Sequence, residues 1–347
     1  MTTKSFRLCG IAAALLSIPL LLSSAAAENI KVRVGVIPVI GASPLFVADK
    51  EGWLRESGLD LSILAFDSGP NIIQAAAGGD IDLYVAGVAP LAFGHTKGID
   101  FRVVTATAVD ENVLVAGAKL NAYMKPGTAP ASAFKKFHSD TNRPVKIATQ
   151  PPNSVPAANL QYWLREVVHV DLADVQVLSM GIDSTQQALL ADAVDAATVR
   201  EPTLTIAQRR NPDIALIAKG EDLFPGQPGT VVAVLSAFLQ QHPQAVQTIV
   251  NSIVRATTEL QKDPDRAVPA IEAALSKGIV DASTIRKSLS SPAVHFVTDP
   301  QTIVESTKAL LAFQVKLGVV PEAPDVGGLF DRSFYARAVS AEKSARD

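Results

Sequence analysis

The sequence predicts an α/β protein with two lobes, each of them a mainly parallel sheet covered by helices. Apolar runs of strand length alternate with stretches of helix length over residues 31–108. This alternation is typical of parallel sheets with helices on both faces. It stops in a stretch with three prolines, residues 121–144, and starts again over 145–218. The restart predicts a second lobe built like the first.

The first run predicts a series of strands separated by helices. Strands are expected at 31–37, 59–66, 81–86, 101–108 and 113–116. A helix over 44–56 follows the first strand. Ser43 is its expected N-cap, and Pro44 stands at the first helical position, where a missing N–H is tolerated. Further helices are expected at 71–77 and from Pro90 onwards.

The second run predicts the same order of elements, followed by a mostly helical remainder. Strands are expected at 145–149, 175–178, 193–199 and 214–218, and helices at 156–168, 184–191 and 202–209. Asp183 is the expected N-cap of the helix at 184–191. Apolar residues recur with helical period over 245–261, 265–275 and 302–317.

One strand is expected to cross back between the lobes. The apolar stretch at 229–235 is interpreted as a strand that returns to the first sheet. The first lobe then consists of residues 28–118 and 229–347, and the second lobe of residues 119–228. The first lobe is therefore predicted to be discontinuous in sequence.

The first 27 residues have the three parts of a secretory signal peptide. Lys4 and Arg7 provide a basic start, residues 8–22 form an apolar run, and the alanines at 25–27 allow cleavage before Glu28. The run is shorter than the about 20 residues of a comfortable membrane span. We therefore expect an exported protein of the periplasm, with a retained N-terminal anchor as the alternative.

Composition and charge exclude several kinds of site and partner. Cys9 is the only cysteine and lies in the expected signal peptide, so the rest of the chain can form no disulfide, zinc thiolate site or cysteine nucleophile. Loss of the two basic residues in that peptide changes the formal net charge from −3 to −5. A mildly acidic protein has no bulk attraction for nucleic acid, so no such partner is expected.

The sequence contains no motif of a known catalytic or metal site. Its five histidines are far apart, and it has no metal-ligand spacing, nucleophile elbow, phosphate-binding loop or dinucleotide fingerprint. We expect no catalytic residue, no metal and no cofactor. A glycosidase-type pair of carboxylates is not excluded by the sequence and has no positive support in it.

Small or polar loops recur between strands and helices. They are expected at 41–44, 67–70, 87–90, 150–154 and 200–202. In a parallel sheet such loops lie at the carboxyl ends of the strands, where open α/β sheets bind ligands. The helices that follow direct unpaired N–H groups and a partial positive charge to the same place. Five such loops in two lobes favour a ligand-binding cleft over five unrelated helix caps.

The expected ligand-binding residues belong to these loops. They are Ser43, Pro44, Ser68, Gly87 and Val88 in the first lobe, and Gln150, Asn153, Ser154 and Glu201 in the second. Two roles are open for Glu201: it accepts hydrogen bonds from an amine or a ring N–H of the ligand, or it only suits the dipole of the helix that it precedes. Strand alternation predicts that Arg200 points away from the cleft.

Motifs in both halves of the chain resemble one family of proteins. In order, they are Gly35-Val36-Ile37-Pro38, Glu51-Gly52-Trp53, Gly79-Asp80-Ile81-Asp82, Gly87-Val88-Ala89-Pro90, Val194-Asp195-Ala196 and Glu201-Pro202. Their order and spacing are similar to those of periplasmic solute-binding proteins for aliphatic sulfonates, taurine, nitrate and thiamine precursors. The resemblance covers residues 34–217 or so.

The resemblance implies a periplasmic binding protein fold of type II, in which two lobes close over a small ligand about a hinge. It implies a monomer that delivers a small polar or anionic solute, such as a sulfonate, to an ABC importer with a transmembrane permease and a cytoplasmic ATPase. Two departures from the family concern the solute. Residues 138–144 replace the usual Asp-Leu-Lys-Gly-Lys turn, and residues 150–154 replace a loop that often has Gly or Ser-Thr.

Two other functions remain open from the sequence. An exported enzyme on the same fold, similar to thiamine-precursor synthases, would need a nucleophile or base in the cleft. Synthases of that type use a loop rich in His and Cys, and the chain beyond residue 27 has no cysteine. A periplasmic sensor partner that presents its ligand to a membrane receptor would have the same sequence features as a transport protein.

Overall fold

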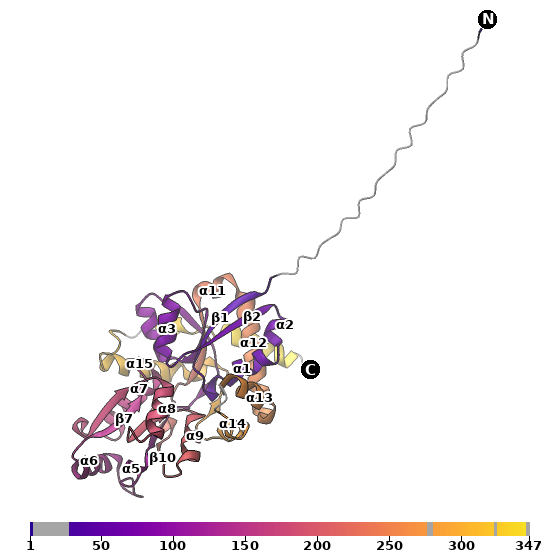
Figure 1. Ribbon diagram of the computed structural model, residues 1–347. Coiled ribbons are helices and arrows are strands. Elements are labelled where there is room, and N and C mark those ends of the chain that lie inside the picture. Colours follow the sequence, from indigo (N-terminus) through magenta and orange to yellow (C-terminus); the bar gives the residue numbers. More distant parts are fainter. Residues whose placement is uncertain (3–27, 276–279, 323–324, 345–347) are drawn as a thin grey trace.

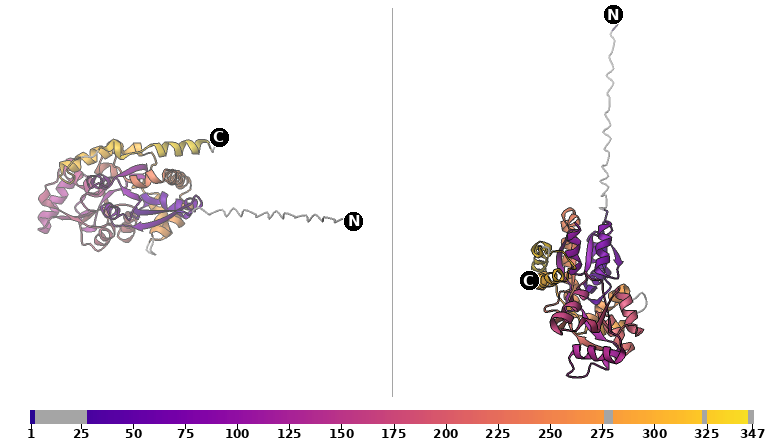
Figure 2. Two further views of the ribbon diagram at one scale, coloured as in Figure 1. Left: turned by 90° about the horizontal axis from the view of Figure 1, so that it is seen from above. Right: turned by 90° about the vertical axis from the view of Figure 1, so that its left-hand side faces the viewer.

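A computed structural model of the 347-residue chain describes residues 1–2, 28–275, 280–322 and 325–344. It has two lobes, each built on a five-stranded sheet with helices packed against it (Figures 1 and 2). The predicted α/β fold with two lobes is confirmed. The expected signal peptide, apart from its first two residues, lies outside the described residues.

The sheet of the first lobe has the strand order β2-β1-β3-β11-β4. Its strands are β1 (Ile30–Val36), β2 (Leu59–Ala65), β3 (Leu83–Gly87), β4 (Phe101–Ala106) and β11 (Thr230–Leu235). β1 pairs with β2 and β3 in parallel, whereas β11 is antiparallel to both β3 and β4. The strand expected at 229–235 therefore does return to the first sheet.

The sheet of the second lobe repeats this arrangement with the order β8-β7-β9-β6-β10. Its strands are β6 (Val113–Ala116), β7 (Val145–Thr149), β8 (Val175–Ser179), β9 (Ala196–Val199) and β10 (Ala215–Ala218). β7 is parallel to β8 and β9, and β6 is antiparallel to its two neighbours. In each lobe four strands run one way and one strand runs the other way, so each sheet is mainly parallel as predicted.

Short helices connect the strands of the two sheets, and the longest helices follow β11. The helices between the strands of the first lobe are α1 (Ser43–Lys50), α2 (Trp53–Glu56), α3 (Gly69–Ala77) and α4 (Ala89–Thr96). Those of the second lobe are α5 (Ala118–Asn121), α6 (Pro130–Thr141), α7 (Val155–Tyr162), α8 (Ile182–Leu190), α9 (Thr203–Arg210) and α10 (Gly220–Leu223). The C-terminal part has α11 (Ser236–Gln241), α12 (Pro243–Lys262), α13 (Pro264–Leu275), α14 (Ala282–Leu289), α15 (Val304–Lys316), α16 (Val326–Leu329) and α17 (Ser333–Ser344).

Three details of the predicted helices are wrong. The helix expected at 44–56 is divided into α1 and α2, because Gly52 between them has a left-handed φ of 81°. Ser43 is the first residue of α1 and not its N-cap, since a 3₁₀ turn at Ile40–Ala42 leads directly into the helix. In the second lobe, α8 begins at Ile182, so Asp183 lies in its first turn and does not cap it.

The C-terminal helices connect the two lobes. α13 packs against α1 of the first lobe and against α14, which in turn packs against α9 of the second lobe. α15 contacts α4 in the first lobe and α7 in the second. In Figure 2 the last helices of the chain, coloured yellow, lie along one side of the molecule. Within the described residues no helix is both long and apolar enough to span a bilayer.

Acid is expected to weaken the attachment of the C-terminal helices at Asp299. Its carboxylate accepts hydrogen bonds from Arg332 Nε at 2.8 Å and Nη2 at 2.6 Å, and from the backbone N–H of Gln301 at 3.0 Å. The guanidinium of Arg332 is the main cause of a lowered pKa of Asp299. Because the pKa is lower in the folded state, the stabilisation is present above the unfolded value of about 3.9 and is lost as the pH falls through the folded value.

The Asp299→Asn variant tests this pH dependence. We expect it to be less stable than the original chain at pH 7 and to lose less stability between pH 5 and pH 2. Urea titrations at each pH measure the free energy of unfolding. Parallel curves for the two proteins would show that Asp299 carries no pH-dependent stabilisation.

Candidate functional site

The carboxyl ends of the main strands meet in pairs where the two lobes touch. After β1 and β9, the N–H of Ile40 donates to the carbonyl of Glu201 at 3.0 Å. After β2 and β8, the N–H of Ile182 donates to the carbonyl of Asp67, also at 3.0 Å. After β3 and β7, a Cβ placed on Gly87 would lie 2.8 Å from Cγ2 of Val155. We call this region, in which the three pairs of loops meet, the strand-end junction.

The first-lobe residues predicted for the site are buried in or beside this junction. Ser43 and Pro44 are the first residues of α1, Gly87 is the last residue of β3, and Val88 and Ser68 precede α4 and α3. The side chains of Ser43 and Ser68 have no exposed surface, and the Oγ atom of each has no hydrogen-bond partner. Buried hydroxyl groups are normally paired. Ser43 and Ser68 are therefore two unusual unpaired hydroxyl groups, and they lie on neighbouring strand ends.

The second-lobe residues of the 150–154 loop differ in their surroundings. Gln150 is buried and its Oε1 has no partner, whereas Asn153 is half-buried. Ser154 is the N-cap of α7 and accepts a hydrogen bond from the N–H of Ala157 at 3.3 Å. The predicted residues thus lie at one junction, but Ser154 already has a structural partner.

Glu201 is held by hydrogen bonds from its own chain. Its carboxylate accepts from the N–H of Thr205 at 3.1 Å, from Oγ1 of Thr205 at 3.0 Å and from Oγ of Ser288 at 3.0 Å. The first two contacts pair donors of Thr205 in the first turn of α9, and the third links α9 to α14. This geometry matches the second of the two roles considered for Glu201, that of a carboxylate at a helix N-terminus.

Arg200 lies inside the junction, contrary to the expectation from strand alternation. Its side chain is 2% exposed, and its Nη2 is 3.4 Å from the Cβ position of Gly87. Nε donates to Oδ1 of Asn112 at 2.7 Å, and Nη1 lies 3.6 Å from Oε1 of Glu111. Glu111 also accepts from Oγ1 of Thr230 at 2.6 Å. We call Arg200, Asn112, Glu111 and Thr230 the Arg200 group. In the sequence, the signal for this group is a single arginine directly after an apolar strand.

The Arg200 group is bonded to both chain segments that cross between the lobes. Asn112 belongs to the segment between β4 and β6, and Gln227 to the segment between β10 and β11. The N–H of Asn112 donates to Oε1 of Gln227 at 2.8 Å, and Nε2 of Gln227 donates back to the carbonyl of Asn112 at 3.1 Å. A hinge between the lobes would pass through these two segments.

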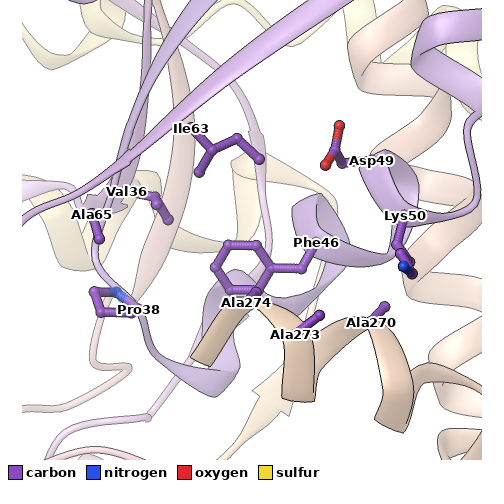
Figure 3. A pocket seen from close by; sticks show the side chains of 10 residues that line it. All are labelled: Val36, Pro38, Phe46, Asp49, Lys50, Ile63, Ala65, Ala270, Ala273 and Ala274. Atoms are coloured by element: carbon purple, nitrogen blue, oxygen red, sulfur yellow. The ribbon is translucent and has the colours of Figure 1, made fainter. Parts of the chain in front are cut away.

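Three cavities surround the junction. The inter-lobe cavity, about 160 Å³, is lined by Pro38, Ala65, Ile182, Asp183, Gln186, Gln187, Pro202, Thr203, Ile206, Ala274, Leu275 and Val280. The α13 cavity, about 280 Å³, lies between β1, β2, α1 and α13 (Figure 3). The third, about 290 Å³, borders α7 and is lined by Gln150 among others. Of the nine predicted residues, Gln150 is the one that lines any of these three.

The arrangement offers hydrogen bonds and burial to a ligand. The described residues hold no group of three or more His, Cys, Asp or Glu side chains placed to bind a metal ion. Buried Tyr84, whose pKa is raised by burial, donates its hydroxyl to the carbonyl of Gly87 at 2.6 Å and so supports the loop after β3. These contacts position the strand ends rather than activate a nucleophile.

Comparison with known proteins assigns the family. The NMT1-like family model matches residues 25–275, which is more than half of the chain. The chain belongs to the NMT1-like family. The resemblance drawn from the sequence motifs is thereby confirmed.

Curated relatives of this NMT1-like protein are named for sulfonate binding and for nitrate import. The putative aliphatic sulfonates-binding protein of Bacillus subtilis (strain 168) is 22% identical over 323 residues, which cover 91% of the chain and 90% of the relative. The nitrate import ATP-binding protein NrtC of Synechococcus elongatus is 25% identical over 257 residues. That match covers 72% of the chain but 38% of the relative, so the chain spans well under half of that protein.

Solved structures confirm the fold of this NMT1-like protein. The periplasmic nitrate-binding protein NrtA from Synechocystis PCC 6803 superposes with a TM-score of 0.75 at 16% identity, covering 90% of this chain and 89% of that chain. The alkanesulfonate-binding protein SsuA from Xanthomonas axonopodis pv. citri superposes with a TM-score of 0.68 at 18% identity, covering 89% and 100%. Both likenesses support the two-lobed periplasmic binding protein fold.

Proposed function

We propose that this protein is a solute-binding protein of the periplasm, which closes over a small polar or anionic solute and delivers it to an ABC importer. The observation that carries the proposal is the pairwise meeting of strand ends from both lobes, with unpaired buried hydroxyl groups on Ser43 and Ser68. A ligand that bonds to both lobes stabilises the closed state through contacts that the open state lacks. Relatives named for sulfonate binding and nitrate import agree with this role.

The proposal includes the site, the lobes and the partners. The ligand residues are those predicted at the strand ends, with Arg200 as an added member of the junction. The first lobe comprises residues 28–118 and 229–347, and the second comprises 119–228; the pairing of β11 with β3 and β4 supports this division. The partners are a transmembrane permease and a cytoplasmic ATPase, and the binding protein acts as an exported monomer that transforms no substrate.

A binding screen tests the proposal. Sulfonates, nitrate, bicarbonate, pyrimidines, aromatic carboxylates and alkylamines are added in turn, and the melting temperature and radius of gyration are measured. A true ligand at 100 times its Kd adds about 2.7 kcal/mol to the free energy of unfolding. We expect one class to raise the melting temperature and to reduce the radius of gyration.

Paired variants locate the binding site in the same screen. We expect the double variant Ser43→Ala/Ser154→Ala to lose the ligand-induced shift, because it removes hydroxyl groups from both lobes. Ser154→Ala also removes the N-cap bond of α7, which costs about 1 kcal/mol without ligand. The shift is therefore compared with and without ligand for each protein. Ser290→Ala/Ser340→Ala, at exposed positions, is the control. Turnover of a chromogenic substrate without lobe closure would favour an exported enzyme instead.

A further inference from the structure

The inter-lobe cavity and the α13 cavity are neighbours, and we call the two together the channel. They share Pro38 just after β1, Ala65 at the end of β2 and Ala274 on α13. Their volumes are about 160 and 280 Å³. The channel therefore combines a cavity lined by both lobes with a cavity within the first lobe.

The α13 cavity is mainly apolar. Figure 3 shows Phe46 in the middle of it, with Val36 and Ile63 on the strand side. The α13 side contributes Ala270, Ala273 and Ala274, whose small side chains leave the space open (Figure 3). Asp49 and Lys50 provide one charge of each sign at its edge. This part of the channel suits a hydrocarbon chain or ring.

The second lobe provides the polar wall of the inter-lobe cavity. Gln186, Gln187 and Thr203 line it together with Asp183. Thr203 Oγ1 donates to Oε1 of Gln186 at 2.7 Å, so the amide oxygen of Gln186 is engaged by its own chain. A ligand in the channel would meet apolar groups at one end and hydrogen-bonding groups at the other.

The charges at the polar end disfavour an anion. Asp183 is the one charged residue among those that line the inter-lobe cavity. Two helices begin there, and each has a carboxylate of this chain at its N-terminus: Asp183 in the first turn of α8, and Glu201 bonded to the N–H of Thr205 in α9. These carboxylates already offset the partial positive charge of the helix ends. Arg200 is directed to Glu111 and Asn112, so its charge is not directed to Asp183.

We propose that the channel binds an amphipathic amine, with its ammonium group beside Asp183 and its apolar body between Phe46 and α13. This inference rests on the proposed function and narrows its solute class. A cation is attracted by Asp183, whereas a sulfonate of the same length would meet a negative group there. The apolar body gains affinity by leaving water for the α13 cavity.

Calorimetric titration with two matched series tests the inference. The probes are n-butylamine, n-hexylamine, butanesulfonate and hexanesulfonate. From butylamine to hexylamine, we expect the affinity to rise about fourfold with each added methylene. Each sulfonate should bind at least about tenfold more weakly than the amine of the same length. Sulfonates that bind more tightly than the amines, or amines whose affinity does not depend on chain length, would overturn the inference.

Variants separate the two ends of the channel. Asp183→Asn should weaken hexylamine binding about tenfold and leave sulfonate binding unchanged or tighter. Ala273→Leu, at an exposed position of α13, should remove the advantage of hexylamine over butylamine by filling the cavity. Ala336→Leu, at an exposed position of α17, is the matched control and should change neither value. An effect of Ala336→Leu equal to that of Ala273→Leu would contradict the inference.

The outcomes also distinguish this inference from the proposed function. If an anion or another solute closes the lobes while the amines do not bind, the inference is wrong and the solute-binding function stands. If no solute of any class binds or closes the lobes, the proposed function fails and the channel assignment fails with it.

Discussion

Replacement of Arg200 by methionine is expected to lower the free energy of unfolding by about 3–5 kcal/mol. Arg200 and Glu111 are 2% and 1% exposed, and Nη1 lies 3.6 Å from Oε1. Methionine keeps much of the side-chain volume but leaves the Glu111 carboxylate buried without a counter-charge. It also leaves Oδ1 of Asn112 without the Nε donor at 2.7 Å. Urea titration of the original chain and the variant measures the loss.

A double-mutant cycle shows whether the loss comes from the pair. The double variant Arg200→Met/Glu111→Gln leaves no charge buried at this position. We therefore expect it to lose less stability than the two single variants lose in sum. Lys136→Met is the control, because Lys136 pairs with Asp140 on the surface with 68% of its side chain exposed. Its loss should be at most about 0.5 kcal/mol. Additive single losses would show that Arg200 and Glu111 are not coupled.

The strand ends of the candidate site could be predicted from the sequence because they depend on local patterns. Apolar strands followed by small or polar loops place Ser43, Ser68 and Gly87 at the carboxyl edge of a parallel sheet. A second βα series predicts a second edge of the same kind. Since both lobes have the same strand order, the three loops of each lobe meet as pairs.

The role of Arg200 could not be predicted in this way. β9 ends at Val199, so the alternation of side chains along a strand does not extend to Arg200. Its partner Asn112 is 88 positions away in the chain, and no local pattern links the two. The start of α1 was not predicted either, because its N-cap is Ala42, a residue type that does not favour a cap.

The channel depends on packing between distant segments and so also has no local signal. The alanines of α13 indicate a small-residue helix face, but the cavity exists because that face lies opposite Phe46 and Ile63. Sequence reasoning gave the strand-end loops as the binding region. The structure adds a cavity beside them whose walls come from both lobes.

Replacement of Gly87 by valine is expected to favour the open arrangement of the lobes. The φ of Gly87 lies outside the left-handed region, so other residues are compatible with its backbone. Gly87 matters because it lies close to the other lobe. A Cβ at this position would lie 2.8 Å from Cγ2 of Val155 in that lobe and 3.4 Å from Nη2 of Arg200. Overpacking of this kind costs about 1–3 kcal/mol. Because the clash exists only when the lobes are closed, it acts on the closure equilibrium.

A cost of that size predicts a fall in solute affinity of about five- to 150-fold, together with a larger radius of gyration in the presence of solute. Val155→Ala in the Gly87→Val background removes the methyl groups that clash and should restore much of the affinity. Gly94→Ala is the control, since its Cβ would contact Ile73 within the first lobe at 3.3 Å and nothing across the junction. If Gly87→Val closed over its solute as the original chain does, the strand ends would not form the contact on which closure depends. The expected rescue by Val155→Ala ties that contact to a single pair of residues from the two lobes.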